Sequence, residues 1–170
     1  DGVDVQVKIN DPLHLNTTTS NPSEFNDFTK TNTFYGRGNL AFQITSTKSG
    51  QEVCLEFTFS KPVILNKFDI FDIDMLQSSL QNSSTYQDSF RMYATSQLGN
   101  VPLRLIANDS NPTYTIKGQT AVANYFQGVN GDIAHTNVKG ELTLSSETPI
   151  QGLYICYSNG SADDELNNNH

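Results

Sequence analysis

The sequence predicts an all-β protein, an antiparallel β-sandwich of the jelly-roll type with one short helix. Apolar residues alternate with polar residues in many short runs, which is the pattern of strands that bury one face. Gly, Pro, Asn and Ser separate these runs at the short spacing that is typical of sandwiches. No regular alternation of strands with long amphipathic helices occurs, so a parallel α/β sheet is not indicated.

Ten runs have the residue pattern of strands. Two hairpins are predicted among them, one joining 40–44 to 53–59 and one joining 90–94 to 101–107 across Leu98-Gly99-Asn100. The runs cover residues 3–9, 40–44, 53–59, 63–74, 90–94, 101–107, 113–117, 121–126, 138–144 and 150–157.

One short helix is expected near residues 22–30. Asn21-Pro22-Ser23-Glu24 places an N-cap residue, a proline at the first helical position and an acid at the third, which is a typical helix start. The length of 170 residues suits one domain. We therefore expect a single sandwich over residues 1–162 and a flexible tail or linker over 163–170.

The composition indicates an acidic protein that works outside the cell. Asn, Ser and Thr make up 51 of the 170 residues, only 16% are charged, and the formal net charge is −8. Nucleic acid binding requires a basic surface, which ten Lys and Arg residues spread along the chain do not supply. The sequence has no apolar run long enough for a membrane span. Nucleic acid binding and membrane insertion are therefore not expected.

The two cysteines, Cys54 and Cys156, each lie within an alternating apolar run. Each falls on the face opposite the main apolar residues of its run, so the two side chains can meet between neighbouring strands. A disulfide is the expected arrangement in an extracellular chain. Two buried free thiols are the alternative.

Three acidic residues are candidate calcium ligands. Asp72 and Asp74 are two residues apart at the end of a predicted strand, and Asp88 opens the next strand after a polar loop. In an extended strand Asp72 and Asp74 project to the same face, and Ca²⁺ prefers six to eight oxygen ligands. The alternative is that these carboxylates accept hydrogen bonds from loop N–H groups.

Part of the chain resembles a known kind of module. Phe57-Thr58-Phe59-Ser60-Lys61-Pro62-Val63, followed by Phe68-Asp69-Ile70-Phe71-Asp72-Ile73-Asp74 and then Gln87-Asp88-Ser89-Phe90, is similar to ligand-binding β-sandwich modules of exported bacterial proteins and large calcium-dependent surface adhesins. The similarity covers residues 53–95. It implies a role in extracellular binding or adhesion, with a peptide or a sugar held near a bound Ca²⁺.

The expected function is therefore that of a non-catalytic binding domain within a larger multidomain surface protein. Its partner is expected to be a glycan or a peptide on a cell surface or in the matrix, and Tyr86 and Gln87 are the candidate ligand-binding residues because they adjoin Asp88. Two alternatives stay open. A structural spacer of a long adhesin would have no ligand, and a carbohydrate-active enzyme would need two paired carboxylates, which no spacing in the sequence singles out.

Overall fold

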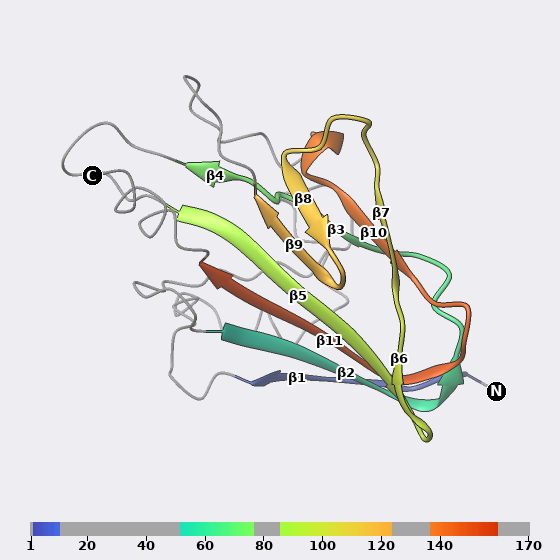
Figure 1. The fold of residues 1–170 in the computed structure, drawn as a ribbon. Helices are drawn as coiled ribbons and strands as arrows, with labels where there is room; N and C mark the ends of the chain where they lie inside the picture. The colour runs from blue at the N-terminus through green and yellow to red at the C-terminus, as the bar shows by residue number, and fades with distance from the viewer. Residues whose placement is uncertain (1, 11–51, 77–85, 124–136, 160–170) are drawn as a thin grey trace.

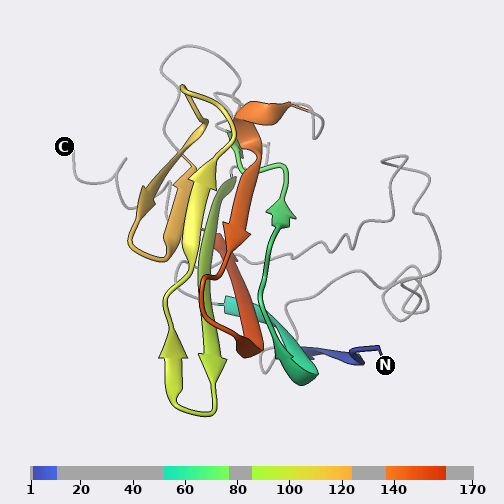
Figure 2. The same cartoon turned by 90° about the vertical axis from the view of Figure 1, so that its right-hand side faces the viewer.

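The structure is a computed structural model, and it describes residues 2–10, 52–76, 86–123 and 137–159. These residues form two antiparallel sheets that pack face to face as two layers (Figures 1 and 2). The predicted all-β sandwich is therefore confirmed. The predicted helix at 22–30, the strand at 40–44 and the tail at 163–170 lie outside the described residues.

The larger sheet has eight strands. Six of them follow the order β1-β2-β11-β5-β9-β8, and β4 and β6 each pair with β5. Its strands are β1 (Val5–Asn10), β2 (Glu52–Val63), β4 (Met75–Leu76), β5 (Tyr86–Ser96), β6 (Gly99–Val101), β8 (Tyr114–Lys117), β9 (Thr120–Ala123) and β11 (Ile150–Asn159).

The smaller sheet has the order β3-β10-β7. It consists of β3 (Phe68–Ile70), β10 (Leu142–Ser145) and β7 (Arg104–Ala107). The described part of the chain has one helical turn, the 3₁₀ helix η1 (Val138–Gly140), in which the Asn137 side chain accepts a hydrogen bond from the Lys139 N–H. No helix among the described residues is long and apolar enough to cross a bilayer.

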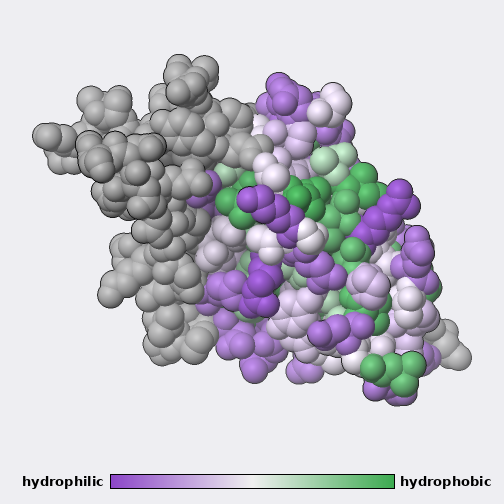
Figure 3. All heavy atoms as spheres, viewed as in Figure 1, coloured by the Kyte–Doolittle hydropathy of each residue, from purple (hydrophilic) through white to green (hydrophobic). Residues whose placement is uncertain are grey.

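The core lies between the inner faces of the two sheets. Phe57 of β2 and Phe68 of β3 meet edge to face with ring centroids 5.4 Å apart, which joins one sheet to the other. The largest fully buried apolar side chains are Tyr114, Ile73, Met92, Leu142, Leu144, Ile150 and Leu153. The Tyr114 hydroxyl reaches a partner inside this core, because it donates to the Glu141 carbonyl at 2.6 Å. The surface in Figure 3 shows hydrophobic side chains over β7 and β8, with hydrophilic side chains around them.

One predicted hairpin is confirmed in part, and the other includes residues 40–44, which lie outside the described residues. Strand β2 pairs with β1 on one side and with β11 on the other. Strand β5 does form a hairpin with β6, with Ala94 opposite Val101. The chain then leaves that sheet at Pro102, which has no N–H to continue the ladder, and β7 joins the smaller sheet.

Two predicted strands are shorter than expected. Within the run 63–74 only Val63, the last residue of β2, and β3 are in strands, and the run 138–144 begins with η1 before β10. Pro62 belongs to the end of β2, near the register shift that separates the pair Val63–Ile150 from the pair Thr58–Gly152. A proline is tolerated at such an irregularity because its missing N–H is not needed there.

Candidate functional site

The candidate site lies at one end of the core, where β5 begins. Side chains alternate along β5, so Asp88 occupies the same inward-facing row as the buried residues Phe90 and Met92. The Asp88 residue is 8% exposed and Asp74 is 2% exposed, so both acidic residues are buried. The structure places these two acids in contact with each other inside the sandwich, and their role as metal ligands stays a prediction.

Asp74 and Asp88 are joined through their backbones and one carboxylate. The Asp88 N–H donates to the Asp74 carbonyl at 3.0 Å, and the Asp74 N–H donates to Oδ2 of Asp88 at 3.0 Å. The other oxygen of Asp88 accepts from the Tyr157 hydroxyl at 2.8 Å. The position of the Asp88 carboxylate is therefore fixed by β11 on one side and by the Asp74 backbone on the other.

The segment before Asp74 is held equally firmly. Ile73 is completely buried, its N–H donates to the Gly140 carbonyl at 3.1 Å, and its carbonyl accepts from the Thr113 hydroxyl at 2.7 Å. These two bonds hold Ile73 between η1 and Thr113. Asp74, the next residue, is thereby placed in the interior.

Asp72 lies next to this anchored segment and differs from the other two acids. It is exposed, and its φ of 67° puts it in the left-handed region, which Asp tolerates better than most residues. Residues 71–74 are not part of a strand. The expectation that Asp72 and Asp74 project to one face of an extended strand is therefore wrong. Asp74 contacts Asp88 directly, and Asp72 acts on it through its charge. The carboxylate oxygens of the three acids do not all lie within 4.8 Å of one another in this structure.

The Asp88 carboxylate lies in an electrostatically unfavourable environment. Its pKa is raised to about 7, mainly by burial; the hydrogen bonds from Asp74 and Tyr157 oppose this shift, and the negative charges of Asp74 and Asp72 add to it. Among the described residues, every charged group that acts on the Asp88 carboxylate is another acid. A proton or a cation would relieve this repulsion.

The two predicted ligand-binding residues, Tyr86 and Gln87, are the first two residues of β5 and adjoin Asp88. By strand alternation, Gln87 lies on the opposite face of β5 from Asp88, and its amide donates to the Ala123 carbonyl at 2.7 Å. The Tyr86 backbone pairs with Leu76, and its side chain lies outside the described atoms. Their role in ligand binding stays a prediction.

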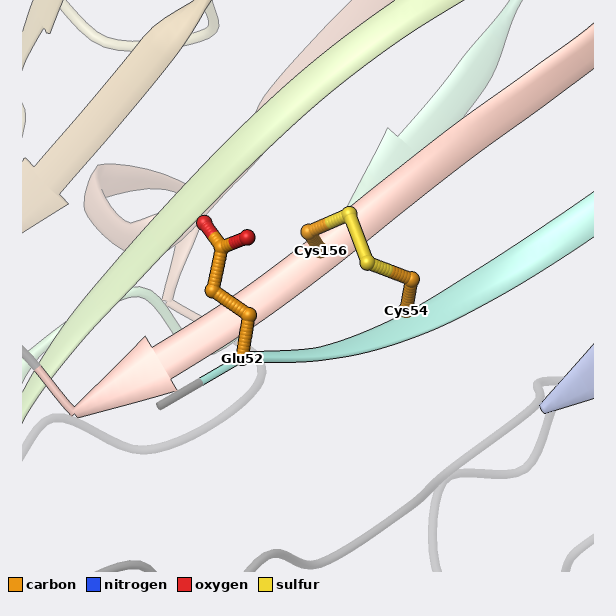
Figure 4. Close-up of side chains that lie close together, drawn as sticks. All are labelled: Glu52, Cys54 and Cys156. Atoms are coloured by element: carbon orange, nitrogen blue, oxygen red, sulfur yellow. A yellow bond between two sulfur atoms is a disulfide. The ribbon is translucent and has the colours of Figure 1, made fainter. Parts of the chain in front are cut away.

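The disulfide is confirmed on the outer face of the larger sheet. Cys54 of β2 and Cys156 of β11 are directly opposite each other in the antiparallel ladder and are bonded across 102 residues of sequence. Figure 4 shows that the Glu52 side chain extends from β2 over β11 toward β5, beside this bond. The carboxylate and the two sulfurs lie within 4.8 Å of one another. Because metal binding by cysteine requires thiolates, this group is not a metal site while the disulfide is intact.

Sequence reasoning missed a polar cluster on the same face. Arg91 of β5 binds the Glu52 carboxylate with two nitrogens, one of them at 3.0 Å, and it also lies over the Tyr93 ring at 5.3 Å. Tyr93 in turn stacks on Tyr154 with centroids 4.5 Å apart. These residues all occupy outward positions of neighbouring strands, and knowledge of the strand order would have been needed to find them.

The stacked tyrosines do not offer an open platform for a sugar. One face of Tyr93 is covered by Tyr154, and Arg91 also lies over its ring. A Cβ at Gly152 would lie 3.1 Å from the Tyr154 ring and 2.5 Å from the Thr95 hydroxyl, so the Tyr154 ring packs closely beside the bare backbone of Gly152. The cluster is therefore best explained as packing between neighbouring strands.

No family model, curated protein or solved structure gave a significant match to this chain.

Proposed function

We propose that this chain is a non-catalytic binding domain of a larger extracellular surface protein, and that Asp72, Asp74 and Asp88 hold a Ca²⁺ ion. The observation that carries the proposal is the burial of two adjacent acids, Asp74 and Asp88, at one end of the core with a third acid beside them. The partner of the domain is a glycan or a peptide on a cell surface or in the matrix.

Burial of Asp88 beside other acids supports a cation at this place. Burial disfavours the ionised form of the Asp88 carboxylate, and the negative charges of Asp74 and Asp72 disfavour it further. Ca²⁺ prefers oxygen ligands and tolerates irregular geometry. Asp72, Asp74 and Asp88 would supply carboxylate oxygens, and the ion would join the start of β5 to the segment that precedes β4.

An extracellular setting supports the same proposal. The disulfide is compatible with an oxidising environment, and free calcium is abundant outside cells. The low content of basic residues and the net charge of −8 also suit a protein that binds cations.

A purely structural role for the acids is the competing explanation. Asp88 does accept the Asp74 N–H and the Tyr157 hydroxyl, and a protonated Asp88 would keep these contacts without any ion. The two explanations differ in what calcium does to stability, because only a bound ligand stabilises the native state by mass action.

Thermal unfolding in EDTA and in millimolar calcium distinguishes them. A Ca²⁺ site predicts a higher melting temperature in calcium, with a gain of about 2.7 kcal/mol at a hundredfold excess over the dissociation constant. Asp74→Ala should lose most of this gain. Glu147→Gln is the matched control, because Glu147 is an exposed acid in the turn between β10 and β11, at the end of β11 away from Asp88, and it should keep the full gain. An unchanged melting temperature in the native chain contradicts the calcium site.

Binding of the partner is tested separately with glycan and peptide arrays, each run with calcium and with EDTA. Signals that depend on calcium and are lost in Asp74→Ala support a binding domain whose ligand site depends on the ion. Stabilisation by calcium without any array signal would instead favour a structural spacer.

A further inference from the structure

The edge of the larger sheet at β1 has a surface that is complementary to itself. Strand β1 pairs with β2 along one side, and no described strand pairs with its other side (Figure 1). Val5 is 51% exposed and Val3, just before the strand, is 42% exposed. Open edges of this kind pair readily with another strand unless charge or proline prevents it.

The direction of the backbone groups on β1 follows from one contact. The Ser60 N–H donates to the Asp4 carbonyl at 2.9 Å, so the backbone of Asp4 points toward β2. In an antiparallel pair this orientation alternates. The backbone N–H and C=O groups of Gln6 and Lys8 therefore also point toward β2, whereas those of Val5 and Val7 point to the open edge.

The residues on this edge match a second copy of the same strand. If two β1 strands pair antiparallel about Gln6, Val5 lies opposite Val7, and these are residues whose backbone groups point outward. Asp4 of each copy then lies opposite Lys8 of the other, in the closer type of pair where side chains meet. Val3 lies opposite Ile9. Both charges are thereby neutralised and both exposed valines are covered.

We propose that this chain forms a symmetric dimer through antiparallel pairing of β1 with β1 of a second copy, centred on Gln6. The larger sheets of the two copies then form one continuous sheet. Pairing of one strand edge buries much less area than a stable interface needs, so the dimer is weak, with a dissociation constant on the order of micromolar or higher. At a crowded surface or in a tandem protein such an affinity is sufficient, because linkage raises the effective concentration.

Charge exchange tests the register directly. The symmetric dimer contains two pairs of residue 4 with residue 8. Asp4→Lys alone makes both pairs Lys–Lys, and Lys8→Asp alone makes both pairs Asp–Asp. Each variant should therefore dimerise roughly 10-fold or more weakly than the native chain. The double variant Asp4→Lys/Lys8→Asp should dimerise like the native chain. An equimolar mixture of the two single variants should form a mixed dimer, because each Lys then faces an Asp.

Sedimentation velocity over a wide range of concentration measures these outcomes, with thermal unfolding to confirm that each variant is folded. Val5→Pro provides an independent test, because it removes an N–H that points to the open edge and leaves the bonds to β2 intact. It should abolish the dimer. A native chain that stays monomeric at millimolar concentration overturns the proposal, as does a dimer that all these variants retain. The test is independent of calcium, so it can be made entirely in EDTA.

Discussion

The outer cluster (Glu52, Arg91, Tyr93 and Tyr154) and the inner cluster (Asp72, Asp74 and Asp88) each contain carboxylates, but in opposite environments. On the outer face, the hydrogen bonds from Arg91 lower the pKa of Glu52, its partial burial opposes this shift, and the positive charge of Arg91 adds to it. On the inner face, burial raises the pKa of Asp88, and the neighbouring acids add to that shift. The Glu52 carboxylate has a positive partner within the protein, Arg91, which favours its ionised form. The Asp88 carboxylate is buried beside other acids, and a bound proton or cation would stabilise it.

The largest effect on stability is expected from the Cys54–Cys156 disulfide on the outer face of the larger sheet. Replacing both cysteines, Cys54→Ser/Cys156→Ser, should lower the free energy of unfolding by roughly 4–5 kcal/mol, because the bond closes a loop of about 100 residues in the unfolded chain. Urea unfolding measures this difference, and reduction of the native protein should give the same loss. A loss of unfolding free energy below about 1 kcal/mol would mean that the disulfide adds little to the stability that strand pairing and the core provide.

The second largest effect is expected in the pH dependence of stability that Asp88 of the inner cluster causes. Asp88 has a pKa of about 7 in the folded protein and an ordinary value of 3.8. Between these values the native state holds a proton that the unfolded state has released, so in EDTA stability should fall as pH rises from about 4 to 7, by up to about 4 kcal/mol.

Asp88→Asn should remove this slope, because the amide oxygen still accepts the Asp74 N–H and no charge is buried. Urea unfolding at a series of pH values measures the slopes of both proteins. The variant should also be the more stable protein at pH 8 in EDTA. Equal slopes in the native chain and the variant would show that another group is responsible.

The smallest effect is expected at the exposed ion pair. The side chains of Arg91 and Glu52 are 48% and 32% exposed, and pairs in contact with solvent contribute about 0–1 kcal/mol. Arg91→Gln should therefore cost at most about 1 kcal/mol at pH 7. The sign of the pH dependence is opposite to that of Asp88. Because the pKa of Glu52 is lowered, its contribution is present at neutral pH and is lost as pH falls through its folded pKa. Chemical unfolding at pH 7 and pH 3 measures both.

The fold class and the disulfide could be predicted because both depend on local alternation. The faces of Cys54 and Cys156 follow from the period of two along each strand, and the structure pairs these two residues. The described neighbours of β2 could not be predicted, because proximity in sequence favours local pairing. Strand β2 pairs with β1 and with β11, from the two ends of the described chain.

The candidate site was predicted only in part, for a related reason. The spacing of Asp72 and Asp74 suggested a shared strand face, whereas the backbone turns at Asp72 and Ile73 is held by η1 and Thr113. The role of Tyr157 could not be foreseen, because it depends on β11 lying beside β5. Contacts between strands distant in sequence are set by topology, which the local pattern does not encode.

Calorimetric titration of calcium into the chelator-treated protein tests the central claim most directly. At pH 8, where Asp88 is ionised, the native chain should bind one Ca²⁺ per molecule at the inner cluster, and Asp88→Asn should bind it much more weakly or not at all. Arg91→Gln, which alters only the outer cluster, should bind like the native chain. Absence of binding by the native chain, or equal binding by Asp88→Asn, would contradict a calcium site at Asp72, Asp74 and Asp88.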